Sequence, residues 1–499
     1  MAAQDRLNAL DYTTIIIGAG ISGIGAGISL DKYRLGSFCI LEKESELGGT
    51  WRDNRYPGVA VDILSFSYSY SFEMNPNWSR LYSPGAEIQE YVQHCAKKYR
   101  IREHIRFNAA VAKAVFSEQR NDWEVYLHSG EMLRCRYLIS ATGILNQPVL
   151  PDIPGLDSFV GTVMHTGRWD SNIDLSGRRV GVIGTGASAV QVVPSIAAHV
   201  KHLNVYQRTP IWVAPKFDFA LTDSARNILQ RVPGALRAAR WASEVALQVA
   251  TFAVVNYRRL PFMTAIAERQ CSRFLHSQVR DPTLREKLQP RYGFGCKRPA
   301  ISNDYLKTFT RENVSLVTEG IREITPRGIV THDGHEQPLD VLILATGFKT
   351  LELGNSPSYD VLGVDGLELG QFWHEHRYQA YQGVAVPGFP NYFLTFGPYT
   401  GGFNWFAMLE THLRLIVRSM QKAKKLKATR VEVSQQAHDR YFEQMLARSQ
   451  GTVFKDAACV SAHSYYLDHH GDASAPAPVT PWWRWLTMRV TPLRGFQFR

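Results

Sequence analysis

The sequence predicts an α/β fold with two Rossmann-like dinucleotide-binding domains and a helical insertion. Three observations predict it. An apolar run followed by a GxGxxG turn lies near the N-terminus, a similar unit begins at residue 179, and residues 216–290 are typical of helices with little turn chemistry. The chain has 499 residues, which is enough for two or three domains with a sizeable core.

The first unit has the spacing of a nucleotide cradle. Gly18, Gly20 and Gly23 follow an apolar run and precede a helix-like stretch. Glycines at these positions let backbone N–H groups approach a pyrophosphate at the helix N-terminus. The next expected strand, 37–41, ends at Glu42, which lies 42 − 23 = 19 residues past Gly23. An acid at this distance accepts hydrogen bonds from ribose hydroxyls. The alternative is a glycine-rich turn without a ligand.

The second unit differs at the ribose position. It has the form GxGxxA, and its turn consists of Gly184, Thr185, Gly186, Ser188 and Ala189. Arg208 ends the next expected strand, 202–206, and lies 208 − 189 = 19 residues past Ala189. An arginine there binds a 2′-phosphate through charge-assisted hydrogen bonds, whereas an acid repels it. We therefore expect FAD in the first cradle and NADP in the second. A solvated strand-end residue is the alternative for Arg208.

Composition narrows the functional classes. The net charge of +11 is explained either by a solvated basic surface or by partial compensation for two dinucleotides, and no nucleic-acid-binding module is recognisable. Six cysteines without a CxxC pair or metal-ligand spacing are typical of isolated thiols in a reducing cytosol, which predicts a cytoplasmic protein. The first residues lack a secretory signal, and the apolar stretch 242–257 is too short and interrupted for a membrane span.

The electron acceptor follows from the same cysteine pattern. Disulfide reductases share the plan of two nucleotide cradles, but they need a redox-active cysteine pair near the flavin. The sequence offers no such pair. Electrons from NADPH must therefore leave the flavin another way, and molecular oxygen is the expected acceptor.

Residues 159–170 carry a more specific pattern. They resemble the FxGxxxHTxxW fingerprint of type I Baeyer–Villiger monooxygenases at Phe159, Gly161, His165, Thr166 and Trp169. Asp170 stands where proline is common. The related flavin-containing monooxygenases, which oxidise nitrogen and sulfur, carry a similar string that usually lacks the threonine and has Phe or Tyr in place of Trp169. Thr166 and Trp169 thus favour the Baeyer–Villiger branch.

Three further strings resemble this family, and the resemblance spans about residues 10–420. Residues 48–62 match GGxWxxxx(F/Y)PGxxxD, 340–348 match the ATG(F/Y) strand and turn that closes the NADP domain, and 296–299 match the segment with the active-site arginine. The resemblance implies an FAD- and NADPH-dependent monooxygenase that forms a C4a-peroxyflavin. It inserts one oxygen atom of O2 beside a ketone carbonyl to give an ester or lactone, with sulfides as further substrates.

The resemblance places the catalytic positive charge on Arg298 and its carboxylate partner on Asp62. A nucleophilic peroxide needs a permanent cation nearby, and arginine stays protonated. The alternatives are a surface-loop arginine and a turn acid. Lys297 is implied as the partner of Arg208 at the 2′-phosphate, and Thr209 as a hydroxyl contact. An exposed lysine and a plain strand-end threonine are the alternatives there.

Other flavin contacts are implied by position. They are Ser22, Thr50, Trp51, Asp62, Tyr68 and Val111, the last through the backbone of a strand expected at 109–115. Core packing is the alternative for these residues. His165 and Trp169 are interpreted as a hydrogen-bonding and packing device on an interdomain linker, which couples NADP movement to catalysis. A general base is the alternative for His165.

The expected domain order is a split FAD-binding domain around an NADP-binding domain. The FAD-binding parts are residues 1–147 and 338–499, and the NADP-binding part, 148–337, follows a proline-rich link. The helical insertion, about 215–290, is interpreted as packed on the NADP domain, because amphipathic helices mostly face a core. A substrate lid or a membrane-surface patch is the alternative.

The substrate side is less defined. Segment 397–408 is rich in aromatic residues and methionine and is expected to border the pocket of an apolar ketone, with core packing as the alternative. The aromatic, basic tail 481–489 caps the domain or touches lipid. The expected partners are therefore an apolar ketone and O2, with peripheral membrane contact left open. An N- or S-hydroxylating flavin-containing monooxygenase and an FAD-containing protein without turnover are the competing functions.

Overall fold

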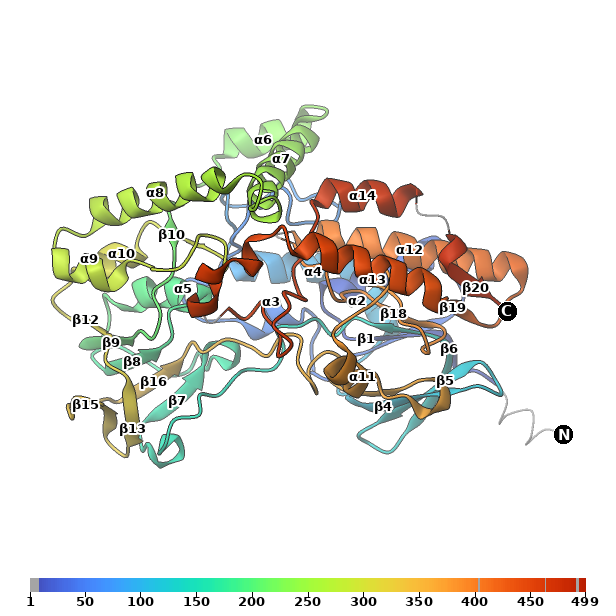
Figure 1. Ribbon diagram of the computed structural model, residues 1–499, viewed down its shortest axis with the longest axis horizontal. Coiled ribbons are helices and arrows are strands. Elements are labelled where there is room, and N and C mark those ends of the chain that lie inside the picture. Colours follow the sequence, from blue (N-terminus) through green and yellow to red (C-terminus); the bar gives the residue numbers. More distant parts are fainter. Residues whose placement is uncertain (1–8, 403, 463, 491–492) are drawn as a thin grey trace.

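The computed structural model describes residues 9–402, 404–462, 464–490 and 493–499. Figure 1 shows two sheets side by side, with most of the helices above them. The larger sheet is built from both ends of the chain, and the smaller one from the middle. This arrangement confirms the prediction of an α/β protein with two Rossmann-like units.

The first sheet has the strand order β17-β4-β5-β6-β1-β2-β3, with β18 beside β6. Its strands are β1 Tyr12–Ile17, β2 Phe38–Leu41, β3 Ile105–Arg106, β4 Val111–Ser117, β5 Asp122–Leu127, β6 Met132–Ser140, β17 Asp360–Leu362 and β18 Tyr392–Leu394. Strand β1 is parallel to both of its neighbours, β2 and β6. Strand β2 is buried along its whole length, as expected for parallel strands with helices on both faces.

The second sheet has the order β12-β9-β8-β16-β7 and is parallel throughout. Its strands are β7 Thr162–His165, β8 Arg179–Ile183, β9 His202–Tyr206, β12 Val314–Val317 and β16 Val341–Leu344. A domain boundary at 337 would separate β16 from its neighbours in this sheet. The boundary is better drawn after Leu344. The fingerprint residues were expected on a linker between the domains. In the structure, residues 162–165 form β7, the edge strand of the second sheet.

Short strands complete the two halves. The pairs are β10 Val213–Ala214 with β11 Ala300–Ile301, the antiparallel set β13 Ile321–Thr325, β14 Gly328–Thr331 and β15 Glu336–Pro338, and β19 Val431–Val433 with β20 Phe496–Phe498. Short 3₁₀ helices occur at η1 Ile101–His104, η2 Leu156–Ser158, η3 Thr166–Arg168, η4 Val364–Gly366, η5 Val453–Lys455, η6 Ala457–Ala462 and η7 Leu493–Gly495.

The α-helices cover the sheets and build the insertion. They are α2 Ile21–Lys32, α3 Thr50–Asp53, α4 Gly85–Lys98, α5 Ala187–Ile196, α6 Asp223–Arg231, α7 Ala235–Val255, α8 Pro261–Gln278, α9 Pro282–Leu288, α10 Tyr305–Thr308, α11 Leu369–His376, α12 Trp405–Leu426, α13 Gln435–Ser449 and α14 Pro481–Val490. The insertion is helical as predicted, from α6 to α9. Across the described ranges, none of the helices has both the length and the hydropathy needed to cross a membrane.

The insertion does not pack as the amphipathic pattern predicted. Helix α8 lies beside β10 and α10, on the side of the second sheet. Helix α7 contacts α6, α8 and, from the C-terminal segment, α14, and its buried side chains are the polar Ser243, Gln248 and Thr251. The expectation that the apolar side of this segment faces the core is therefore wrong for α7.

Candidate active site

The first cradle is the turn between β1 and α2. Gly23 is required there, because a Cβ atom at this position would lie 1.8 Å from the carbonyl oxygen of Gly18. Among the described residues, no side chain caps α2, so its first N–H groups are available to an anion. Helices α12 and α13, by contrast, are capped by Asn404 and Ser434. The turn thus fits a pyrophosphate.

Glu42 directly follows β2, the place in the chain that the spacing predicts for an acid. It is only 6% exposed, and its Oε2 atom accepts a hydrogen bond from the N–H of Ala19 at 2.7 Å. Burial raises the pKa of Glu42, and the N–H groups of Ala19 and Glu44 act in the opposite direction. Ala109, two residues before Val111, donates its N–H to the carbonyl oxygen of Glu42 at 2.8 Å, so the start of β4 adjoins this carboxylate.

The predicted ring-side contacts lie close together. The indole Nε1 of Trp51, in α3, donates to the hydroxyl of Tyr68 at 3.1 Å. Ser22 accepts a hydrogen bond at 2.9 Å from the Nε1 of Trp405, which begins α12. Thr50 opens α3 directly after the Gly48–Gly49 turn. Three aromatic side chains, Trp51, Tyr68 and Trp405, and the hydroxyls of Ser22 and Tyr68 therefore form hydrogen bonds at this end of the first cradle.

The second cradle has the same design. Helix α5 follows the Gly184–Gly186 turn, and within the described chain no side chain caps it. A Cβ atom at Gly186 would meet nothing within 4 Å, so the turn is open on the side where a pyrophosphate binds. Thr185 fixes the turn to the end of the next strand, since its hydroxyl donates to the carbonyl oxygen of Thr209 at 2.7 Å.

Arg208 and Lys297 bring two cations together at the ribose end of this cradle. Burial, followed by the charge of Arg208, lowers the pKa of Lys297 to about 8. In the part of the chain that the structure describes, neither side chain is paired with a carboxylate. Two neighbouring cations without an acid between them fit a dianionic 2′-phosphate. The structure thus brings together the pair that the sequence proposed for NADP.

Arg298 and Asp62 form a bidentate ion pair, although 236 positions separate them in the sequence. The Nε atom of Arg298 lies 2.6 Å from Oδ2 of Asp62, and Nη2 lies 2.7 Å from Oδ1. The Arg298 side chain is 22% exposed and that of Asp62 is 34% exposed. Burial disfavours the guanidinium charge, but Asp62 and then the phenols of Tyr466 and Tyr465 outweigh this effect and raise the pKa of Arg298.

A contact with α5 positions the loop that carries Asp62. Gln191, in α5, accepts a hydrogen bond from the hydroxyl of Tyr56 at 2.8 Å and donates to the carbonyl oxygen of Ala60 at 2.9 Å. The loop therefore spans from the first cradle to the helix of the second. The sequence analysis did not identify Gln191, because a single glutamine in a helix carries no signal of a long-range contact.

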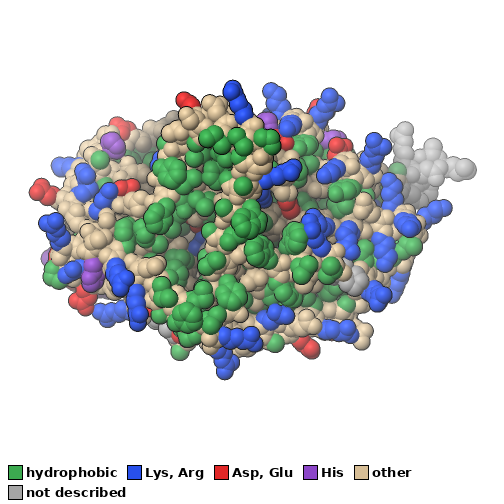
Figure 2. All heavy atoms as spheres, turned by 90° about the horizontal axis from the view of Figure 1, so that it is seen from above, with side chains coloured by type: hydrophobic (Ala, Val, Ile, Leu, Met, Phe, Trp, Pro, Cys, Tyr) green, Lys and Arg blue, Asp and Glu red, His purple; other side chains and the backbone are tan. Residues whose placement is uncertain are grey.

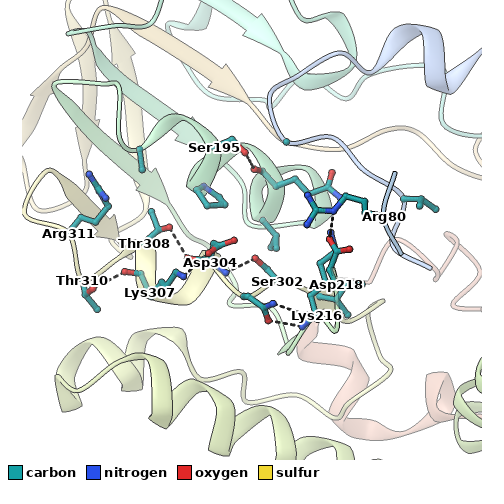
Figure 3. Close-up of a pocket in the computed structure, with 18 residues that line it drawn as sticks. Arg80, Ser195, Lys216, Asp218, Ser302, Asp304, Lys307, Thr308, Thr310 and Arg311 are labelled. Carbon is teal, nitrogen blue, oxygen red and sulfur yellow. Dashed lines mark hydrogen bonds and ion pairs between the residues drawn. The ribbon is translucent and has the colours of Figure 1, made fainter. Parts of the chain in front are cut away.

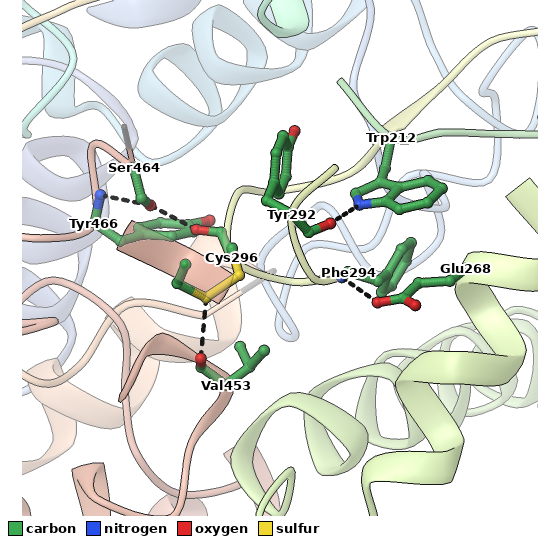
Figure 4. The surroundings of a disulfide bond; sticks show 9 residues. Trp212, Glu268, Tyr292, Phe294, Cys296, Val453, Ser464 and Tyr466 are labelled. Atoms are coloured by element: carbon green, nitrogen blue, oxygen red, sulfur yellow. Dashed lines mark hydrogen bonds between the residues drawn. A yellow bond between two sulfur atoms is a disulfide. The ribbon is translucent and has the colours of Figure 1, made fainter. Parts of the chain in front are cut away.

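The loop that carries Arg298 is tied to the C-terminal segment by a disulfide. Cys296 is bonded to Cys459, and the hydroxyl of Ser464 donates to the carbonyl oxygen of Cys296 at 2.6 Å (Figure 4). The expectation of isolated thiols is wrong for these two residues, because the fold joins segments 163 positions apart. Cys39, Cys95, Cys135 and Cys271 are buried free thiols. Tyr465 and Tyr466, in the same segment, act on the pKa of Arg298 and were also missed.

The fingerprint residues take part in packing and in local hydrogen bonds of the second half of the protein. Phe159 lies in the hydrophobic core of the second sheet, and a Cβ atom at Gly161 would lie 2.5 Å from the carbonyl oxygen of Asp340. The Nδ1 atom of His165 accepts a hydrogen bond from the N–H of Gly167 at 3.0 Å. Burial lowers the pKa of His165, opposed by the backbone of Gly347, so the imidazole is neutral at pH 7.

Thr166 and Trp169 complete this turn. Thr166 is fully buried at the start of η3, and Trp169 packs against the core of the second sheet. Arg168, between them, lies 3.5 Å from Asp53, which ends α3 in the first half of the chain. The turn therefore contacts the segment that carries Thr50 and Trp51.

Most side chains of segment 397–408 for which the structure gives contacts pack in the hydrophobic core. Phe406 is fully buried and makes edge contacts with Tyr68 and Tyr70, and Met408 lies in a second core cluster. Trp405 is the member that reaches the first cradle. Phe403, which the sequence analysis grouped with these residues, lies outside the described ranges.

A separate polar cavity of about 610 Å³ lies beside the Asp62 loop (Figure 3). Its lining includes Gly58 and, from the last turn of α5, Ser195. Arg80 and Lys216 both pair with Asp218 at its wall, at 2.9 and 3.0 Å. The cavity lies at the opposite end of α5 from the Gly184–Gly186 turn, so it is distinct from the second cradle.

Comparison with known proteins gives a consistent picture. Residues 15–242 match the family described as pyridine nucleotide-disulphide oxidoreductase. The chain is 35% identical over 478 residues to a Baeyer-Villiger monooxygenase of Pseudomonas aeruginosa, covering 95% of this chain and 89% of that protein. It is 36% identical to a Baeyer-Villiger monooxygenase of Streptomyces coelicolor, covering 93% of this chain and 88% of that protein.

Solved structures resemble the whole chain. Cyclohexanone monooxygenase from Rhodococcus sp. Phi1, bound to NADP+, has a TM-score of 0.87 and 27% identity, and the alignment covers 98% of this chain and 99% of that one. A complex of the enzyme OTEMO with FAD and NADP has a TM-score of 0.86 and 28% identity, with 98% of this chain and 100% of that one covered.

Proposed function

Since the chain belongs to the Baeyer–Villiger monooxygenase family, we infer that it is an NADPH-dependent flavoprotein that inserts one atom of O2 beside a ketone carbonyl. The products are an ester or lactone, NADP+ and water. FAD, when bound, accepts the electrons of NADPH and transfers oxygen to the substrate. The alternative of an N- or S-hydroxylating enzyme gains no support from the two relatives described above, both of which are named for the Baeyer–Villiger reaction.

Each cofactor has a cradle with matching chemistry. We assign FAD to the turn at Gly18–Gly23, with Glu42 on the ribose and Trp51, Tyr68 and Trp405 toward the ring. We assign NADP to the turn at Gly184–Ser188, with Arg208, Thr209 and Lys297 at the 2′-phosphate. Among the described residues, helix N-termini without a side-chain cap and two cations without a carboxylate partner support these assignments.

The Arg298–Asp62 pair is the observation that carries the proposed chemistry. An arginine stays protonated throughout turnover, so it stabilises negative charge that develops on oxygen beside the ring. The bidentate contact with Asp62, at 2.6 and 2.7 Å, fixes the plane of the guanidinium. We propose Arg298 as the catalytic cation and Asp62 as the group that orients it.

The finer features of the function are further proposals. An apolar ketone suits the aromatic side chains of Trp51, Tyr68 and Trp405. The FAD-binding parts are proposed as 1–147 and 345–499, around an NADP-binding part, 148–344. His165 and Trp169 are proposed to couple these parts, because η3 contacts α3. A cytoplasmic location is proposed because the reaction consumes NADPH, which is regenerated there.

Replacement of Arg298 tests the proposed chemistry. We expect Arg298→Ala to retain FAD and its reduction by NADPH, while ketone oxygenation falls about 10²–10³-fold, the usual cost of removing an electrostatic donor at an oxyanion. Stopped-flow absorbance measures reduction, and product mass with labelled O2 measures oxygenation. Arg327→Ala, at an exposed pair with Glu336, is the control. Normal ketone oxygenation by Arg298→Ala would refute the assignment.

A further inference from the structure

Helix α7 directs its polar side to the protein and its apolar side outward. Its buried side chains are Ser243, Gln248 and Thr251. Trp241 is 66% exposed and Phe252 is 42% exposed on the same helix. An amphipathic helix of a globular protein normally has the opposite arrangement. Within the described residues, the outer side of α7 therefore lacks the apolar partner that its composition requires.

The orientation of α7 is fixed by polar contacts on its inner side. Arg240 donates from Nη1 to the carbonyl oxygen of Ser69 at 2.9 Å. Glu244 accepts a hydrogen bond from the Nδ2 atom of Asn404 at 2.7 Å. Turning the apolar side inward would break both contacts and leave buried polar groups unsatisfied, which costs free energy. The outward apolar side is thus a stable feature of the fold.

Helix α14 extends this apolar surface. It packs beside α7, and the N–H of Trp482 lies 3.4 Å from the side-chain oxygen of Gln248. We define the α7–α14 face by the exposed side chains Trp241, Val249, Phe252, Trp482, Trp485 and Leu486. Figure 2, seen from above, shows hydrophobic side chains gathered across the middle of this side of the molecule, with many lysine and arginine side chains and fewer acidic ones around them. Contiguous apolar surface of this kind marks an interaction site.

Around the α7–α14 face, positive side chains lie on the outer side and the glutamates lie on the inner side. Residues 223–278, from the start of α6 to the end of α8, contain eight arginines, two glutamates and one aspartate, Asp223, which pairs with Arg226. Both glutamates are engaged on the inner side, Glu244 with Asn404 and Glu268 with the N–H of Phe294 at 2.7 Å. Arginines such as Arg258 and Arg259 are exposed. In α14, Arg489 lies 3.6 Å above the ring centre of Trp485. The outward charge is therefore positive.

These features favour an anionic lipid surface over a second copy of the chain. A symmetric dimer through this face would bring two arginine-rich surfaces together, which like-charge repulsion opposes. A bilayer with anionic headgroups attracts the arginines, and tryptophan rings lie favourably at its headgroup level. A bilayer also accepts scattered aromatic side chains without a complementary surface of fixed shape. We propose that the α7–α14 face docks on the surface of an anionic lipid bilayer.

Docking at this face would place the first cradle close to lipid. Ser69, which holds Arg240, follows Tyr68, and Asn404, which holds Glu244, precedes Trp405. Tyr68 and Trp405 are contacts at the ring end of this cradle. The lipid surface would then lie about one helix diameter, ~10 Å, from these contacts.

Vesicle flotation of the FAD-loaded protein tests this proposal. One set of vesicles contains phosphatidylcholine alone, and a second also contains phosphatidylglycerol. We expect flotation with the second set, weakened by added salt because surface charges are screened. Arg258→Ala and Arg259→Ala are each expected to weaken binding about fivefold, the usual effect of one basic residue at an anionic surface. Arg327→Ala, at an exposed residue on the second half, is the charge control.

The apolar contribution has its own variants. Trp241→Ser and Trp485→Ser should each reduce flotation, whereas Val160→Ser should not, because Val160 is 81% exposed but lies before β7, far from α7. Visible FAD absorbance shows that each variant is folded. Absence of flotation by the native holoprotein, or equal flotation by all variants, would overturn the proposal. A native protein that is a dimer in solution and does not bind vesicles, with tryptophan variants that are monomers, would also overturn the proposal and would identify the face as a dimer interface.

Discussion

The affinity for NADP+ should depend on pH through Lys297, and the structure sets the size of the effect. Burial and the neighbouring Arg208 lower the pKa of Lys297 to about 8. A bound 2′-phosphate dianion favours the charged amine, so the pKa rises on binding and a proton is taken up. Affinity is therefore full below pH 8 and is lost as the pH rises above that value.

The magnitude follows from the protonated fraction of Lys297 before binding. With a pKa of about 8, roughly nine-tenths of the amines are charged at pH 7 and roughly one-tenth at pH 9. The affinity for NADP+ should thus fall about tenfold between these pH values relative to that for NAD+, which lacks the 2′-phosphate. Equilibrium titration at constant ionic strength, followed by the flavin absorbance change, measures both affinities.

Two variants separate this explanation from a general effect of pH. Lys297→Arg keeps the charge at all these pH values, so the ratio of NADP+ to NAD+ affinity should become independent of pH. Arg208→Ala removes the repelling cation, so the decline should begin at higher pH while NADP+ binds more weakly throughout. A ratio that stays constant from pH 7 to 9 in the native protein would refute the reasoning. So would an unchanged slope in Lys297→Arg.

Two further predictions concern stability. Burial, then the charge of Arg484, lowers the pKa of His412 to about 3, so the native state holds this histidine neutral. Stability is then present above the unfolded value of about 6.5 and falls by about 1.4 kcal/mol per pH unit below it. Urea titrations from pH 7 to 5 should show this slope, reduced in His412→Gln. Removal of the disulfide by Cys459→Ser should lower the unfolding free energy by about 2–4 kcal/mol. Six titratable thiols in the unreduced, denatured native protein would contradict the pairing with Cys296.

The two cradles could be predicted from the sequence because their signals are local. A strand, a glycine turn and a helix follow one another within about 20 residues, and the ribose-binding residue lies one strand further on. Glu42 and Arg208 were placed by counting from Gly23 and Ala189, and the strands ended where expected. The Arg298–Asp62 pair, 236 positions apart, came from family resemblance alone, since no periodicity links such distant residues.

The features that the sequence did not predict are contacts between distant segments or orientations of whole helices. Gln191 and Cys459 carry no local pattern that names their partners. The direction of α7 was predicted wrongly for a related reason. Its apolar residues have helical spacing, and spacing alone does not say which side faces the protein. The contacts of Arg240 and Glu244 with other segments decide the orientation.

The position of Arg298 depends on three long-range connections rather than on its own loop. Asp62 contacts its guanidinium directly, and Gln191 ties the loop of Asp62 to α5. The disulfide at Cys296 holds the arginine loop two residues away. Lys297 adjoins Arg298 in the same loop, so a 2′-phosphate that draws Lys297 also restrains its neighbour. The proposed catalytic cation is thereby held from α5, from the Asp62 loop and from the C-terminal segment at once, which limits the freedom that a loop of glycine and proline residues would otherwise have.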